Sequence, residues 1–224
     1  MFLSKVTLNN SSLAKQELIK LLDKGAYASH QLLWKLFADT AEQQRPFIFR
    51  EEINHGVPTF YVLSRVAPLN KPEIFVQHVK PFSPKLVAGS RLAFQLRANP
   101  TININDGSKN GKNHDVLMHA KTKLKKSGIQ DVEQIKLGQE AAARDWLQDE
   151  KRLNSLGIEL EAVPDIVSYQ QHLSYKRQGK IRFSTVDYQG VLKVVQPDRF
   201  VTKIAEGIGR AKAFGCGLML MRRV

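Results

Sequence analysis

Strand-like and helix-like patterns follow one another in a similar order in two successive parts of the chain, which limits the folds open to it. Alternating apolar and polar residues indicate strands, and apolar residues three or four apart indicate helices. The order in the first part is strand, helices, two strands, connector, strand. We expect strands at 2–8, 46–53, 59–65 and 73–79, a helix at 13–22, and a second helix with the buried stripe Leu32, Leu33, Leu36 and Phe37.

The second part repeats much of this order. We expect strands at 91–98, 158–163, 169–174, 180–188, 190–195 and 218–221, helices at 131–156 and 199–208, and a polar, lysine-rich loop at 101–126. A sheet with helices packed on one face accommodates such an order. The sequence therefore predicts an α+β fold of two tandem ferredoxin-like (RRM-like) domains, 1–88 and 89–224, each an antiparallel sheet with helices on one face.

The chain carries a large excess of positive charge. Its 224 residues include 34 Lys and Arg against 21 Asp and Glu, a formal net charge of +13. This excess favours an anionic partner, with nucleic acid first and an acidic membrane surface second. Residues 1–88 hold 11 basic and 7 acidic side chains, and residues 89–224 hold 23 and 14. We therefore expect extended phosphate contacts mainly in the second part.

Cysteine and histidine usage excludes several classes of protein. A single cysteine cannot form an internal disulfide, and the six histidines are scattered without the spacing of a zinc site. No run of about 18 apolar residues could cross a membrane. The opening MFLSKVTLNN lacks the features of a signal peptide. We expect a cytoplasmic protein with no metal or other cofactor.

The segment 207–217, Gly-Ile-Gly-Arg-Ala-Lys-Ala-Phe-Gly-Cys-Gly, is the most specific local signal. Glycine lets backbone N–H groups approach a phosphate closely, and Arg210 and Lys212 add positive charge. Neither the phosphate-binding P-loop nor the dinucleotide fingerprint matches the segment. Two interpretations stay open: a phosphate cradle, and a tight turn that requires positive φ angles. The glycines concerned are Gly207, Gly209, Gly215 and Gly217.

Two residues of the second helical run could carry chemistry. Tyr27 and His30 are three residues apart and would share one face of a helix. A histidine can accept or donate a proton near neutral pH. The alternative is that His30 is an ordinary residue of the first helical turns. Trp34 is assigned to the core.

A basic hairpin is expected between the strands at 169–174 and 180–188. Its tip carries Lys176, Arg177, Lys180 and Arg182 around Gly179, and could contact nucleic acid. The alternative is a hairpin that is merely solvated. The acidic residues show no pattern of a magnesium nuclease, and the aromatic signature with which RRM domains stack single-stranded bases is absent.

Taken together, these segments resemble the type I-E CRISPR repeat-processing endoribonucleases, the CasE family. The matching segments span the whole chain in order: Met-Phe-Leu-Ser-Lys-Val at 1–6, Tyr27-x-x-His30-Gln-x-Leu-Trp34, Phe-Gln-Leu-Arg-Ala-Asn-Pro at 94–100, the basic hairpin followed by Tyr-Gln-Gly-Val-Leu at 188–192, and the glycine-rich end at 207–218. Each segment is modest alone, but their order and spacing together are highly specific.

The resemblance implies two ferredoxin-like domains that bind the stem-loop of a CRISPR repeat in precursor RNA and cut at the 3′ base of the stem. The 2′-OH before the cut attacks the phosphate without a metal, leaving a 2′,3′-cyclic phosphate. His30 and Tyr27 match the family's catalytic pair, and the basic hairpin matches its stem-binding element. The enzyme is expected to be a monomer in isolation, to join other Cascade subunits and to have no membrane partner. The alternative is a structured-RNA-binding module without catalysis.

Overall fold

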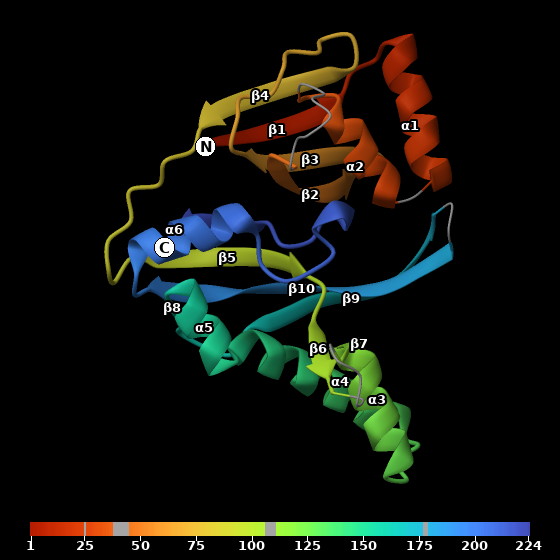
Figure 1. Cartoon of the computed structure of the whole chain (residues 1–224), viewed down its shortest axis with the longest axis vertical. Coiled ribbons are helices and arrows are strands. Elements are labelled where there is room, and N and C mark those ends of the chain that lie inside the picture. Colours follow the sequence, from red (N-terminus) through yellow and green to blue (C-terminus); the bar gives the residue numbers. More distant parts are fainter. Residues whose placement is uncertain (25, 38–44, 106–110, 177–178) are drawn as a thin grey trace. The chain divides into compact units, whose positions relative to one another are not determined.

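The computed structural model describes residues 1–24, 26–37, 45–105, 111–176 and 179–224. The chain divides into two compact units (Figure 1). Unit 1 comprises Met1–Lys85, Leu173–Arg182 and Ile204–Leu218, and unit 2 comprises Leu86–His172, Phe183–Lys203 and Met219–Val224. The glycine-rich segment therefore groups with the N-terminal residues, although it lies near the end of the sequence.

Unit 1 contains a sheet in the order β2-β3-β1-β4. Its strands are β1 (Phe2–Leu8), β2 (Phe47–Asn54), β3 (Val57–Ser64) and β4 (Phe75–Pro81), and every neighbouring pair is antiparallel. Helices α1 (Ser12–Lys24) and α2 (Ala26–Trp34) both precede β2. The fully described connector 65–74 forms turns and no helix. This is the strand order of a ferredoxin-like sheet, as predicted.

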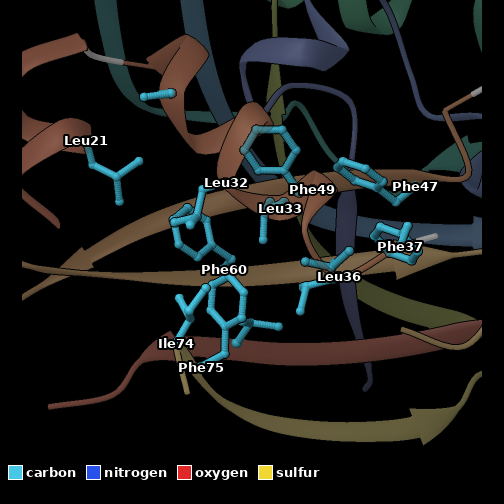
Figure 2. Packing of buried hydrophobic residues seen from close by; sticks show 13 residues of the cluster. Leu21, Leu32, Leu33, Leu36, Phe37, Phe47, Phe49, Phe60, Ile74 and Phe75 are labelled. Atoms are coloured by element: carbon cyan, nitrogen blue, oxygen red, sulfur yellow. The ribbon is translucent and has the colours of Figure 1, made fainter. Parts of the chain in front are cut away.

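The core of unit 1 lies between α1, α2 and the sheet (Figure 2). The predicted stripe of α2 and the turn after it is buried: Leu33 and Leu36 have no exposed surface, and Leu32 and Phe37 have 2% and 4%. Burying an apolar side chain of this size contributes about 1.5–3 kcal/mol. Phe37 also stacks on Phe47, with ring centroids 4.8 Å apart. The helical period therefore identified the face of α2 that meets the sheet.

The second sheet has the order β11-β5-β10-β8, with β9 also paired to β10, and most of its residues belong to unit 2. Its strands are β5 (Arg91–Ala98), β8 (Ile158–Leu160), β9 (Asp165–Lys176), β10 (Gly179–Val194) and β11 (Met219–Arg223). The β10–β5, β10–β8 and β11–β5 pairs are antiparallel. Helix α6 (Pro197–Glu206) precedes the glycine-rich segment. The order matches that of the first sheet, with β8 and β9 sharing one position, so the predicted tandem fold is confirmed.

The strands of the first sheet precede residue 88 and those of the second follow it. We accordingly propose domains 1–88 and 89–224. The compact units differ from these ranges because residues 173–182 and 204–218 group with unit 1.

The prediction of a loop at 101–126 is wrong. The segment contains β6 (Thr101–Ile104), β7 (Lys112–Asp115) and helix α3 (Val116–Lys126). Asp115 is the N-cap of α3, and its side chain accepts a hydrogen bond from the Met118 N–H at 2.8 Å. Val116 and Leu117 are buried, which anchors the first turn. The cap and these two apolar residues outweigh the polar composition from which the loop was inferred.

Two further predictions, about where elements divide, are wrong. The expected helix 131–156 is divided into α4 (Val132–Gln148) and α5 (Glu150–Leu156) by Asp149, whose side chain caps α5. The two expected strands 180–188 and 190–195 form the single strand β10. At Gly190 the neighbouring Phe94 ring leaves little room, because an added Cβ would lie 3.1 Å from it. Gly190 therefore lies within β10 at a place where a side chain would meet the Phe94 ring.

Candidate active site

Helix α2 carries both predicted catalytic residues. The Tyr27 and His30 rings have centroids 5.8 Å apart. The helix is tied to the sheet beside them, because the buried Ser29 hydroxyl donates a hydrogen bond to Glu51 Oε2 on β2 at 2.7 Å. A buried side-chain hydrogen bond of this kind fixes a helix against its neighbour. Tyr27 and His30 therefore project from a backbone that is held in place.

Aromatic rings surround His30. The Trp34 Nε1–H donates a hydrogen bond to His30 Nε2 at 3.2 Å. The Phe47 and Phe49 rings, both on β2, have centroids 5.7 and 6.5 Å from that of His30. Because Nε2 accepts from Trp34, the neutral imidazole carries its hydrogen on Nδ1. The half-buried imidazole is thus held in one tautomer.

Trp34 has a role that the sequence analysis missed. It packs against the core of unit 1, as predicted, and in addition it donates to His30. The spacing of four residues places the two side chains on one helix face, so this signal was present in the sequence.

The glycine-rich segment lies against α2 and β2 within unit 1. Its short 3-10 helix η1 (Lys212–Phe214) contacts both elements. The Phe214 and Tyr27 rings have centroids 5.9 Å apart. Added Cβ atoms at Gly207 and Gly215 would lie 3.2 and 3.3 Å from Ile48 and Phe49 of β2. Folding therefore brings the segment's Phe214 beside the Tyr27–His30 pair.

The segment folds as a tight turn. Its four glycines, Gly207, Gly209, Gly215 and Gly217, have φ angles of 79°, 78°, 80° and 93°, which side-chain-bearing residues rarely adopt. Gly217 is the most constrained, because an added Cβ would lie 2.8 Å from the Ile208 carbonyl oxygen. The Ile208 N–H donates to the Gly217 carbonyl at 2.9 Å. The tight turn is thus present, and the phosphate cradle stays a prediction.

The predicted RNA-binding cations have different surroundings. Lys212 Nζ donates to the Glu206 carbonyl at the end of α6, at 2.7 Å, whereas Arg210 is exposed. Such a lysine stabilises the end of a helix, where carbonyls lack partners. Lys176 is the last residue of β9, Lys180 is near the start of β10, and Arg182 is exposed on β10. Arg177 lies outside the described residues.

The described residues include neither a metal-binding cluster nor a membrane-spanning helix. No group of three or more His, Cys, Asp and Glu side chains there could hold a metal ion. No helix there is long and apolar enough to cross a membrane. Cys216 is buried between two glycines.

Comparison with known proteins identifies the family. A family model described as CRISPR associated protein matches residues 1–223. The CRISPR system Cascade subunit CasE of Escherichia coli (strain K12) is 30% identical over 210 residues, covering 92% of this chain and 96% of that protein. The chain belongs to this family of CRISPR-associated proteins. The resemblance to CasE seen in the order of the sequence motifs is thereby confirmed.

Other members of the family also match this chain along nearly its whole length. The CRISPR-associated endoribonuclease Cse3 of Thermus thermophilus is 28% identical, with 98% of each protein covered. A structure of Thermus thermophilus Cse3, bound to an RNA representing a pre-cleavage complex, matches with a TM-score of 0.69 at 25% identity, covering 99% of this chain and 98% of that chain. The family relation thus extends along both sheets and through the glycine-rich end.

Proposed function

We propose that this protein is a metal-independent endoribonuclease that binds the stem-loop of a CRISPR repeat in precursor RNA. It cuts at the 3′ base of the stem, releases mature guide RNA sequences from the precursor, and stays bound as a subunit of a Cascade complex in the cytoplasm. Membership of a family with curated members named CasE and Cse3 supports this proposal. The observation that carries it is the placement of Tyr27, His30 and Phe214 in one ring cluster of unit 1.

The reaction needs two proton transfers. The 2′-oxygen before the cut forms a bond to phosphorus, and the bond from phosphorus to the 5′-oxygen breaks. The 2′-OH loses its proton to a base, and the leaving 5′-oxygen receives one from an acid. The products are a 2′,3′-cyclic phosphate and a 5′-OH. Side chains that exchange protons at neutral pH can serve both transfers, each typically contributing about 10²–10⁴-fold in rate.

His30 and Tyr27 supply the groups for these transfers. The hydrogen bond from Trp34 holds the His30 imidazole in a defined orientation, and an imidazole can take up or give a proton near neutral pH. The hydroxyl of Tyr27, on the same helix, can donate a hydrogen bond to a reacting oxygen, and its deprotonated form can accept a proton from one. The surrounding aromatic rings shield part of the imidazole from water, and electrostatic interactions are stronger where water is excluded.

The RNA is held by the glycine-rich segment and the basic hairpin. Gly207, Gly209, Gly215 and Gly217 let backbone N–H groups approach a phosphate, and Arg210 and Lys212 offset the charge that gathers on it. The hairpin binds the stem. A-form RNA is recognised mainly through its shape and its phosphates, which suits cations at a hairpin tip. The hairpin cations are Lys176, Arg177, Lys180 and Arg182.

Single-turnover cleavage of the organism's own repeat hairpin, in EDTA, tests the proposal. We expect His30→Ala to lower the rate by at least about 10² while RNA affinity stays within a few-fold. Tyr27→Phe should lower the rate by a smaller factor, because the ring remains and only the hydroxyl is lost. His78→Ala, which removes an exposed histidine of β4, is the matched control and should cleave like wild type.

The alternative, an RNA-binding module without catalysis, makes a different prediction. The wild-type protein would then bind the hairpin tightly and leave it intact under all conditions. If the wild-type protein cleaves the hairpin and the His30→Ala variant cleaves it at the same rate, His30 is not a catalytic residue.

A further inference from the structure

Helix α3 presents an unusual concentration of positive charge. Its eleven residues contain no Asp or Glu, and Lys123, Lys125 and Lys126 are exposed while Lys121 is partly so. Within the described part of the chain, no carboxylate forms an ion pair with any of the four. Like charges four residues apart on a helix repel and destabilise it. An anionic partner would reduce this repulsion between the lysines.

The helix is a rigid platform for these charges. Asp115 caps its first turn, and the Gln139 side chain on α4 donates to the Leu117 carbonyl at 3.2 Å. Gly138 on α4 allows a close approach, because an added Cβ would lie 2.5 Å from Leu124 Cδ1. A helix fixed by capping and close packing presents its lysines in a defined arrangement before any partner binds.

The four lysines divide into two groups. Lys123 lines a hollow of about 800 Å³ between α3 and α4, together with Asp145 and Asp149. These carboxylates reduce the positive potential on that side. Lys121, Lys125 and Lys126 do not line the hollow, and we call these three residues the lysine face.

We propose that the lysine face binds phosphates of the single-stranded RNA that flanks the repeat stem-loop. This proposal rests on the proposed function. A lysine ammonium is a point charge that contacts phosphate without reading bases. None of the three residues of the lysine face is aromatic, so none offers a ring on which a base could stack. The lysine face therefore contributes affinity that is independent of sequence.

The flanking RNA is proposed because the stem and the cut phosphate already have other partners assigned to them. The lysine face belongs to unit 2, whereas Tyr27, His30, the glycine-rich segment and the hairpin tip at 173–182 belong to unit 1. The groups proposed to hold the stem and the cut phosphate thus come from the other unit. The lysine face is therefore proposed to bind a different part of the same RNA, the single strand that flanks the stem-loop.

The test compares the salt dependence of binding for two RNAs, one the stem-loop alone and one with single-stranded flanks. Both carry a 2′-deoxy nucleotide before the cut. The full-length variant Lys121→Ala/Lys125→Ala/Lys126→Ala is compared with Lys15→Ala/Lys136→Ala/Lys151→Ala, which removes three exposed helix lysines elsewhere. Each lost phosphate contact with a single strand lowers the slope of log K against log salt by about 0.7. We expect a decrease of about 2 for the first variant with the flanked RNA, and none with the stem-loop alone or for the control.

Three results would overturn the proposal. An unchanged slope with the flanked RNA means that the lysine face does not contact RNA. An equal decrease with both RNAs places the contact on the stem-loop. Normal RNA binding combined with lost assembly into Cascade makes the face a protein-binding surface. Alanine favours helices, so an unchanged midpoint of thermal unfolding is expected for both variants. Cleavage of unmodified RNA by wild type, followed in parallel, tests the proposed function separately.

Discussion

Substituting Gly217 tests how the glycine-rich segment is built. An alanine at φ 93° must adopt a conformation that costs about 1–3 kcal/mol. Its Cβ would also lie 2.8 Å from the Ile208 carbonyl oxygen and 3.1 Å from the Ile208 nitrogen. Relieving this contact moves backbone that shares a hydrogen bond with Gly217, at a further cost of about 1–3 kcal/mol. We expect Gly217→Ala to lower the free energy of unfolding by about 2–6 kcal/mol in total.

Gly56→Ala is the matched control. Gly56 lies in the turn between β2 and β3 of the same unit and has φ 78°, but an added Cβ there would meet no atom within 4 Å. It therefore carries the conformational cost without the clash. Urea unfolding of the two variants should show that Gly217→Ala loses about 1–3 kcal/mol more than Gly56→Ala.

The same pair of variants links the turn to activity. A shift at Gly217 moves η1 and with it the Phe214 ring that lies against Tyr27. At a temperature where both variants are folded, Gly217→Ala should cleave repeat RNA more slowly than wild type, and Gly56→Ala should match wild type. Equal losses of stability in the two variants, with equal cleavage, would refute the packing argument.

Three other variants, two with one substitution and one with two, test further interactions. Trp34→Phe removes the N–H that binds His30, and the loss of one hydrogen bond should slow single-turnover cleavage by about 2- to 10-fold with unchanged RNA affinity. Burial raises the pKa of the Asp115 carboxyl above its usual value of about 3.9, so the stability that protonation contributes is lost as pH rises through the folded-state pKa. Asp115→Asn keeps an oxygen that can cap the helix but has no carboxyl group to titrate. The decrease in the unfolding midpoint as pH rises through the pKa of Asp115 should therefore be absent in this variant. Arg177→Ala/Lys180→Ala should weaken binding of the repeat RNA and lower the slope of log K against log salt. An unchanged slope would mean that neither residue contacts the RNA.

Regular periodicity made much of the fold predictable. The stripe of Leu32, Leu33, Leu36 and Phe37 identified the buried face of α2, and alternation identified most strands. Helix α3 was not predicted because its four lysines and the polar residues before it make the segment polar on average. The signals for a helix are short: the capping residue Asp115 and the two apolar residues Val116 and Leu117. Cap and anchor occupy three consecutive residues, and composition over a longer window averages such a signal away.

The candidate site was predictable in its residues but not in its assembly. The spacing of Tyr27 and His30 places them on one helix face, and local sequence contains this information. The contact of Phe214 with Tyr27 joins residues far apart in the chain, and no local pattern specifies it. The hydrogen bond from Trp34 to His30 was readable from their spacing, but an indole in an apolar run is most simply assigned to the core.

The proposed chemistry is tested most directly by one comparison of substrates. Wild-type protein in EDTA is mixed with repeat hairpin RNA, either all-ribose or with a single 2′-deoxy nucleotide before the cut, and the products are identified by mass. We expect the all-ribose RNA to give a 2′,3′-cyclic phosphate and a 5′-OH end, and the 2′-deoxy RNA to bind and stay intact. Cleavage of the 2′-deoxy RNA at the wild-type rate, or cleavage of all-ribose RNA that requires a divalent metal, would contradict the mechanism assigned to His30 and Tyr27.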